Sequence, residues 1–413
     1  MNGSNPAGRS AIRPAALHTA TLAAFFAASS APTPLYRFYQ QAWGFSAMTL
    51  TLAFGIYAVT LLLALLTFGS FSDHVGRKPV ILSALALEIL SMGLFAAASG
   101  TAWLLAARVV QGWATGMVGA AAGAALLDCD RERGPLINSI SPLAGIGLGA
   151  LGSSLLVQFA PAPLRLVYAL LLVVFVVLAT LTARSPETGG TRPGALASLR
   201  PSVAVPARAR SALAWVSPLN TAIWALSGFY LSLMPSLIAK VTGLSGAWPG
   251  GIAVAALTGS GAFSVLAASR RSPDAVLSYA AMALAAGLVA IVGGANLGLT
   301  AVLVAGSVVA GIGLGAGFLA AVRAVMPLAA PQERAGLMAA FYIESYLALS
   351  LPAIAAGYLA QRFGLLTAID LYGASIAVLA VASIALARMR KRASACLAAA
   401  AAPRTVPRTD TRG

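Results

Sequence analysis

Long apolar runs alternate with short polar stretches along nearly the whole chain. Each run holds roughly 20 predominantly apolar residues, the length that an α-helix needs to cross the hydrocarbon core of a bilayer. Lipid cannot satisfy the edge of an open sheet, so these runs are predicted to be helices. The twelve predicted membrane-spanning helices cover about 15–35, 47–69, 79–99, 102–127, 136–158, 164–183, 217–239, 248–268, 275–293, 297–321, 336–359 and 366–387.

The longest polar interruption lies between the sixth and seventh runs, at 184–216. It is rich in Arg and Pro, so we expect a cytoplasmic linker there. The predicted domains are an N-terminal six-helix bundle at 1–183, this linker, and a C-terminal six-helix bundle at 217–390. The remaining residues, 391–413, are expected to form a disordered basic cytoplasmic tail.

The two blocks of six runs also resemble each other. VVQGWATG at 109–116 aligns with VVAGIGLG at 308–315, and GFSA at 44–47 aligns with GLSG at 243–246, both at an offset of 199 residues. Six crossings return the chain to the same side of the membrane, so the halves are predicted to be parallel copies. In transporters built from such repeats, substrate sites lie between the repeats near the midplane.

Composition and charge fit a polytopic membrane protein. Only 9% of residues are charged and 59% are hydrophobic, and the mean hydropathy is +0.86. Most of the 27 Lys and Arg residues fall on one side when both termini are placed in the cytoplasm, as the positive-inside rule expects. The chain has no compact basic domain, so its net charge of +16 is not interpreted as nucleic-acid binding. A cleaved secretory signal at the N-terminus is the alternative to a retained first helix, but further spans follow it.

The turn between the second and third runs, GSFSDHVGRKP at 69–79, concentrates charge in a chain that has little. A glycine permits a tight turn with positive φ, and a proline suits the first turn of the next helix. Taken alone, the basic pair would be an anchor at lipid headgroups. The full string resembles the loop signature of the Major Facilitator Superfamily. The matching positions are Gly69, Asp73, Gly76, Arg77 and Lys78.

This resemblance extends over nearly the whole chain and implies a fold and a role for the turn. The fold would be an all-α membrane protein with twelve transmembrane helices in two parallel six-helix repeats. The turn would act as a conformational latch, with Asp73 facing the N-terminus of the eleventh helix near Gly336 while the cytoplasmic side is closed. A carboxylate stabilises an exposed helix N-terminus by about 0.3–1 kcal/mol.

Few charged side chains lie at membrane depth. Arg108 and Gln111, in ARVVQGWATG, resemble the helix-4 signature of the superfamily, which is linked to proton coupling; a snorkelling arginine is the alternative. Arginine keeps its proton, so it could hold a substrate anion or tune a neighbouring acid, and proton coupling needs a titratable partner. Glu344 and Glu88 are the candidates for a proton or substrate site. A structural hydrogen bond is the alternative for Glu88, because the family fold places its helix at the periphery. His18 is expected at a solvated helix end.

Aromatic side chains are expected to line a central cavity and would suit an apolar ligand. The predicted lining residues are Tyr57, Trp113, Trp224, Tyr230, Tyr342 and Tyr346. A glycine-rich fifth helix resembles the drug efflux branch of the superfamily, although Ala150 replaces a proline of its signature. Prolines at matching places in the first and seventh helices, Pro34 and Pro235, are expected to bend them at the outer gate.

The leading functional hypothesis is a secondary transporter of the bacterial inner membrane that exports a lipophilic small molecule against proton entry. Uptake of a metabolite is the alternative transport hypothesis, and a transport-inactive receptor or scaffold belongs to a different class. No phosphate-binding loop and no cluster of metal-ligating residues occurs in the sequence, so no enzymatic activity, cofactor or metal is expected. The protein is expected to be a monomer, with substrate, protons and membrane lipid as its partners.

Overall fold

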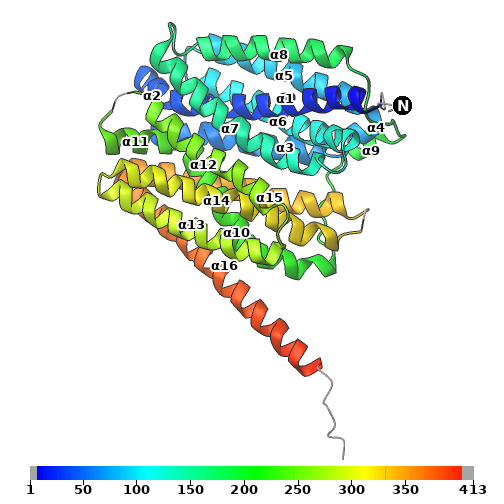
Figure 1. The fold of residues 1–413 in the computed structure, drawn as a ribbon. Coiled ribbons are helices and arrows are strands. Elements are labelled where there is room, and N and C mark those ends of the chain that lie inside the picture. The colour runs from blue at the N-terminus through cyan, green and yellow to red at the C-terminus, as the bar shows by residue number, and fades with distance from the viewer. Residues whose placement is uncertain (1–6, 245, 331, 402–413) are drawn as a thin grey trace, which may run out of the picture.

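The computed structural model describes residues 7–244, 246–330 and 332–401, and every regular element in those ranges is a helix. Two helical bundles lie side by side (Figure 1). The linker that joins them contains the short helix α9 (Ala195–Ser198). The N-terminal half contains α1 (Ala7–Ser30), α2 (Pro32–Trp43), α3 (Ala47–Phe68), α4 (Ser72–Val75), α5 (Arg77–Ala97), α6 (Thr101–Cys129), α7 (Gly134–Phe159) and α8 (Leu166–Arg184). The C-terminal half contains α10 (Ala207–Ser232), α11 (Met234–Thr242), α12 (Trp248–Ala268), α13 (Pro273–Asn296), α14 (Thr300–Val325), η1 (Met326–Leu328), α15 (Arg334–Phe363) and α16 (Leu365–Ala401).

Within the described residues, ten helices are long and apolar enough to cross a bilayer. The pair α10 and α11 passes the same test as one broken span, bent by 62° just before Pro235, as predicted for this proline. The first predicted span, 15–35, is not in this set. It is divided between α1 and α2 at Ala31, and α1 is less apolar because it carries several polar residues. α1 still packs inside the N-terminal half against α6, α7 and α8.

The sequence repeat has the same packing role in both halves. In the N-terminal half, a Cβ on Gly112 of α6 would lie 2.5 Å from the carbonyl oxygen of Tyr57 on α3. In the C-terminal half, a Cβ on Gly311 of α14 would lie 2.0 Å from the carbonyl oxygen of Leu257 on α12. Both helix pairs therefore approach through glycine, which lets their backbones touch. The predicted two-fold repeat of the fold is thus present in the packing itself.

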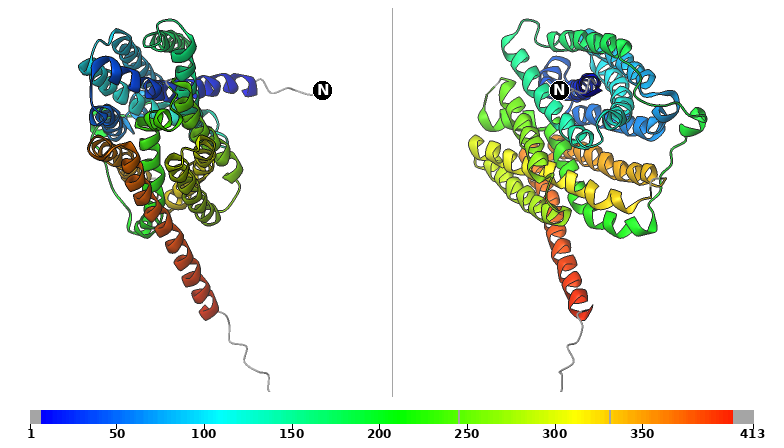
Figure 2. Two further views of the ribbon diagram at one scale, coloured as in Figure 1. Left: turned by 90° about the vertical axis from the view of Figure 1, so that its left-hand side faces the viewer. Right: turned by 45° about the vertical axis from the view of Figure 1, so that its right-hand side comes forward.

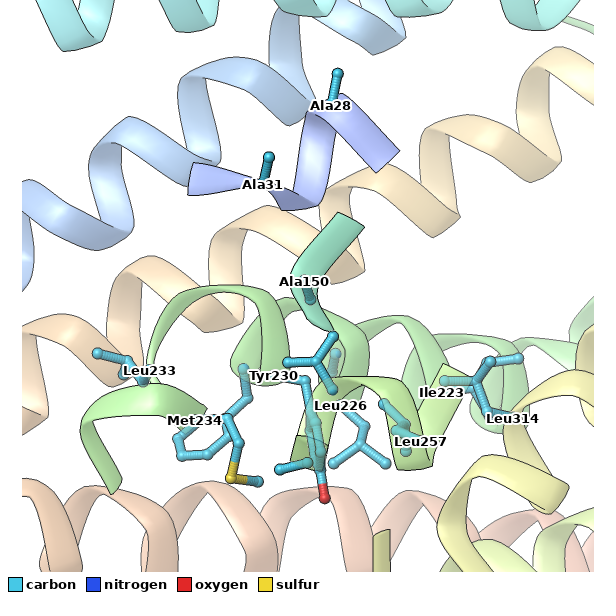
Figure 3. Close-up of a cluster of buried hydrophobic side chains, with 14 of the residues drawn as sticks. Ala28, Ala31, Ala150, Ile223, Leu226, Tyr230, Leu233, Met234, Leu257 and Leu314 are labelled. Carbon is cyan, nitrogen blue, oxygen red and sulfur yellow. The ribbon is translucent and has the colours of Figure 1, made fainter. Parts of the chain in front are cut away.

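The two halves meet along α3 against α15 and α7 against α12. α2 and α11 lie together at one end of the molecule, while α4 and α9 lie at the opposite end (Figure 1). At the end of α2 and α11, Thr33 Oγ1 donates to the carbonyl oxygen of Leu231, 3.0 Å away and in the other half. A buried apolar cluster joins the halves near this end, with Ala28, Ala31 and Ala150 from the first half above the α10 side chains in Figure 3.

Two boundaries differ from the sequence prediction. Helix α10 begins at Ala207, so part of the predicted linker at 184–216 is helical. Helix α16 continues to Ala401, so the tail predicted to be disordered at 391–413 is helical as far as that residue; residues 402–413 lie outside the described ranges. The last turns of α16 extend away from the bundle in both views of Figure 2.

Candidate functional site

Arg108 is the largest side chain that is fully enclosed in the described structure, and it lies on α6 in the core of the N-terminal half. Its Nε donates to the hydroxyl of Tyr36 at 2.7 Å, and its Nη1 donates to the carbonyl oxygen of Ser29 at 2.9 Å and to Gln111 Oε1 at 2.6 Å. The side chain therefore points inward and does not snorkel. A guanidinium with several hydrogen-bond acceptors keeps its charge while buried.

Gln111 continues this network to Glu88 on α5. Its Nε2 donates to Glu88 Oε1 at 3.0 Å. Glu88 is fully buried, and its other carboxyl oxygen, Oε2, has no hydrogen-bond partner in the described part of the chain. The side chain thus faces α6, although its helix was expected at the periphery. Tyr36, Arg108, Gln111 and Glu88 form a continuous line of hydrogen bonds, which we name the buried polar chain.

Three aromatic rings surround the Arg108 guanidinium. Its Cζ lies 5.3 Å from the ring centroid of Tyr36, 5.1 Å from that of Tyr57 and 5.8 Å from that of Phe95. Cation–π attraction at these distances stabilises a desolvated cation. Tyr57 also belongs to an apolar cluster with Tyr346 of α15. Through this tyrosine, the buried polar chain contacts the interface between the two halves.

Among the described residues of the C-terminal half, the corresponding positions hold no equivalent of the buried polar chain. At the repeat offset of 199, the positions of Arg108, Gln111 and Glu88 are taken by Ser307, Ala310 and Gly287. Burying charge is costly unless it is fully paired, and the C-terminal half packs its helices without it. Helix packing alone therefore does not require these charged side chains.

Glu344 lies in the C-terminal half, on α15. Its carboxylate accepts hydrogen bonds from Ser217 Oγ at 2.8 Å, Asn220 Nδ2 at 3.2 Å and Thr221 Oγ1 at 3.3 Å, all on α10. The side chain is partly exposed. The structure therefore gives Glu344 polar neighbours and places it in a different half from Glu88.

The tyrosines beside Glu344 in sequence do not share its surroundings. Residues two apart on an α-helix lie about 200° apart around its axis, since a turn takes 3.6 residues. Tyr342 and Tyr346 thus occupy the opposite flank of α15, where Tyr346 packs on Trp224 with ring centroids 5.0 Å apart. The predicted lining residues Tyr342 and Trp224 are partly exposed, whereas Tyr346 is nearly buried.

The other predicted lining residues differ in exposure. Trp113 is partly exposed and packs edge-on against Phe68. Tyr230 is fully buried and its hydroxyl lies 2.6 Å from Ser307 Oγ. Figure 3 shows its ring among Leu226 and Leu257 inside the apolar cluster. Tyr230 is therefore a core residue and cannot line an open cavity in this conformation.

The signature turn (69–79) is held by ionic contacts around Arg77. Its Nε donates to Asp128 Oδ2, at the end of α6, at 3.0 Å, and its Nη1 donates to Asp73 and to Ser72. Gly76 has φ of 98°, a conformation that only glycine adopts without strain. These contacts fasten the start of α5 to the end of α6.

The linker lies against the start of α15, near which Asp73 was predicted to lie. The amide of Ala204, in the linker, donates to the carbonyl oxygen of Gly336 at 3.3 Å. Asp73 instead pairs with Arg77 of its own turn. The latch contact between Asp73 and α15 therefore stays a prediction for another conformation.

Several residues of these sites escaped sequence analysis. Tyr36, Asp128 and Glu187 contact Arg108 or the signature turn from distant parts of the sequence. Local signals existed for Glu187, an acid in a basic linker, and for Tyr36, an aromatic residue directly after the first predicted span. His18 was expected to be solvated but is 3% exposed, and neither ring nitrogen has a hydrogen-bond partner among the described residues. In the same ranges no group of three or more metal-ligating side chains occurs.

Comparison with known proteins agrees with this architecture. Over 106 residues the chain is 35% identical to the inner membrane transport protein YajR of Escherichia coli (strain K12), a match that covers 25% of this chain and only 22% of that protein. The human organic anion transporter MFSD10 (TETRAN) has a similar fold, with a TM-score of 0.62 and 18% identity over 93% of this chain and 100% of that one. The nucleoside transporter NupG matches with a TM-score of 0.70 and 14% identity over 90% of this chain and 98% of that one. The sequence profile of the Major Facilitator Superfamily matches residues 17–343, and the chain therefore belongs to this family of membrane transporters.

Proposed function

We propose that this transporter exports a lipophilic small molecule in exchange for protons by alternating access. The observation that carries the proposal is the buried polar chain, in which the Glu88 carboxyl is enclosed beside Arg108 with one oxygen unpartnered. Glu88 is the member of this chain whose charge changes readily, since arginine keeps its proton, glutamine does not titrate, and a phenol such as that of Tyr36 ordinarily ionises only at about pH 10.

A proton at Glu88 would change the charge of the interior of the N-terminal half by one unit beside a fixed cation. Electrostatic interactions are strong where water is excluded. Gln111 links this change to Arg108, whose guanidinium lies against the ring of Tyr57. Tyr57 packs in the same cluster as Tyr346 of the other half. We infer that proton occupancy at Glu88 biases the contact between the two halves through this route.

The nature of the substrate follows from the side chains that remain partly exposed. Trp113, Trp224 and Tyr342 offer large aromatic surfaces, which favour a ligand with apolar or aromatic groups. Proteins of similar fold are described as transporters of organic anions and of nucleosides. Because these solutes differ chemically, the proposal for this chain depends on its own side chains.

The test is flux across proteoliposomes under an imposed pH gradient, with a panel of lipophilic cations and neutral dyes. The wild type should move a panel compound against its gradient, driven by proton flow. Glu88→Gln, which is uncharged and nearly isosteric, should lose driven accumulation but keep exchange of labelled for unlabelled substrate, because exchange needs no net proton transfer. Glu132→Gln, on an exposed turn after α6, is the matched control and should behave like the wild type.

Other outcomes would replace the proposal. Driven accumulation by Glu88→Gln equal to that of the wild type would remove Glu88 from the coupling. Accumulation of a sugar or an organic acid, with no flux of any lipophilic compound, would favour uptake of a metabolite. No flux of any solute by folded protein would favour the receptor or scaffold hypothesis.

A further inference from the structure

The linker between α8 and α10 contacts the signature turn through Glu187. This carboxylate accepts hydrogen bonds from the backbone amides of Arg77 at 2.9 Å and Lys78 at 3.1 Å. It also accepts from the amides of Thr188 at 2.9 Å and Gly189 at 3.0 Å within the linker. One side chain therefore organises its own loop and binds the first amides of α5.

The start of α5 needs such a partner. The first amides of a helix have no acceptor within the helix, and the residue before α5 is Gly76, which has no side chain to cap them. A carboxylate there also interacts favourably with the helix dipole. Burial raises the pKa of Glu187, but the hydrogen bonds from the four amides outweigh it and lower the pKa from its ordinary value. Glu187 is thus held as a carboxylate that caps α5 from another segment.

The two segments interlock sterically. A Cβ on Gly76 would lie 2.6 Å from Glu187 Oε2, and a Cβ on Gly189 would lie 2.9 Å from Arg77 Cγ. Gly76 is therefore required twice, once for its positive φ and once for the approach of the carboxylate. The fit between turn and linker depends on a glycine in each.

More contacts extend this attachment along the linker. The amide of Arg192 donates to the carbonyl oxygen of His74 at 3.1 Å, and Lys78 Nζ donates to that of Ser185 at 2.9 Å. Further along, the linker reaches the other half, where Ala204 bonds Gly336 at the start of α15. Beyond it, Arg208 forms an ion pair with Glu333.

We propose that Glu187 is a positioning residue that couples the signature turn to the linker, so that movement of the C-terminal half reaches the Arg77 ion pairs through the linker. The linker then acts as a mechanical strap in the transport cycle. This inference requires only that the protein is a transporter, and it does not depend on proton coupling.

The direct test is limited trypsin digestion of purified protein in lipid nanodiscs. Trypsin cuts after Arg184, where the linker leaves α8, but not after Arg192 or Arg200, because proline follows both. Cleavage after Arg184 tracks the population in which the segment around Glu187 has detached. Glu187→Ala should raise the cleavage rate about tenfold, which corresponds to the loss of about 1.4 kcal/mol, within the usual range for removing a helix cap. Glu132→Gln should leave the cleavage rate unchanged. Cleavage of Glu187→Ala at the wild-type rate would overturn the attachment.

The second test asks whether the attachment serves transport. Glu187 lies in the linker and away from the partly exposed aromatic side chains proposed to bind substrate. Glu187→Ala should therefore lower the maximal rate of exchange of labelled for unlabelled substrate several-fold and change the KM for substrate less than twofold. Glu187→Gln keeps an acceptor oxygen and should lower the maximal rate less than Glu187→Ala does. This variant is the control for misfolding of the alanine variant. A freely cleaved linker with an unchanged maximal rate would refute the role as a strap. Neither measurement needs a pH gradient, so failure here is distinct from failure of the proton-coupling proposal.

Discussion

Replacement of Arg108 by methionine is the most informative perturbation of the buried polar chain. It removes the donors to the Tyr36 hydroxyl, the Ser29 carbonyl and the Gln111 side-chain oxygen. Each buried acceptor left without a donor costs about 1–3 kcal/mol, so the three together give a ceiling of about 9 kcal/mol. Breaking a buried charged network from one side typically costs about 3–5 kcal/mol. We expect Arg108→Met to lower the free energy of unfolding by about 4 kcal/mol.

The double-mutant cycle with Glu88→Gln separates charge from packing. Arg108→Met leaves Glu88 enclosed without its compensating cation, so Glu88→Gln should cost less in that background than in the wild type. We expect a coupling energy of about 1–2 kcal/mol, within the range for residues of one hydrogen-bonded network. Reversible unfolding in mixed micelles with increasing SDS measures all four corners of the cycle. If the unfolding free-energy changes of the two single variants add within about 0.5 kcal/mol, the two charged side chains do not interact energetically, and the reasoning fails.

Three further predictions follow from other parts of the structure. Gly112→Ala should destabilise the protein by about 1–3 kcal/mol, since the new Cβ would lie 1.9 Å from Thr60 Oγ1. Gly152 has open space around it, so Gly152→Ala is the control. Equal thermal stability of the two variants would contradict the close packing of α6 on α3. Glu187 has a lowered pKa in the folded protein, so the hydrogen bonds from Glu187 to α5 should persist at neutral pH. They should be lost only as the pH falls below 4.5, the ordinary pKa of a glutamate, and hydrogen exchange of the Arg77 amide should then rise. An exchange rate that does not depend on pH, after correction for the intrinsic rate, would contradict this capping role. Reporter fusions at the two termini should both be cytoplasmic, and a terminus found outside would overturn the predicted orientation.

The periodic features of the sequence predicted the fold well. Apolar length placed the helices, and the glycines of 109–116 and 308–315 marked the repeat because close helix contact requires small residues. The glycine and proline of the signature turn likewise predicted a tight turn followed by a helix, which begins at Arg77. These features depend on local spacing, which a single sequence displays directly.

Contacts between distant segments were not predictable in this way. Nothing in the pattern around Glu88 indicates that it rotates toward Gln111, since a lone acid in an apolar run has no periodicity of its own. The same holds for Glu187, whose partners in the signature turn are amides over 100 residues away in the sequence. Glu344 differs, because helix geometry alone places it on the opposite flank of α15 from Tyr342 and Tyr346.

The repeat also limits how the molecule can change. Gly287 holds the place that corresponds to Glu88, and a Cβ there would lie 2.3 Å from the amide nitrogen of Ala310. The paired helices α13 and α14 thus touch where α5 and α6 leave room for a carboxylate. An equivalent buried carboxylate cannot be introduced into the second half by side-chain substitution alone, because α13 and α14 would first have to separate. The α5–α6 contact can therefore enclose a carboxylate, whereas the backbone contact between α13 and α14 excludes one at the corresponding place.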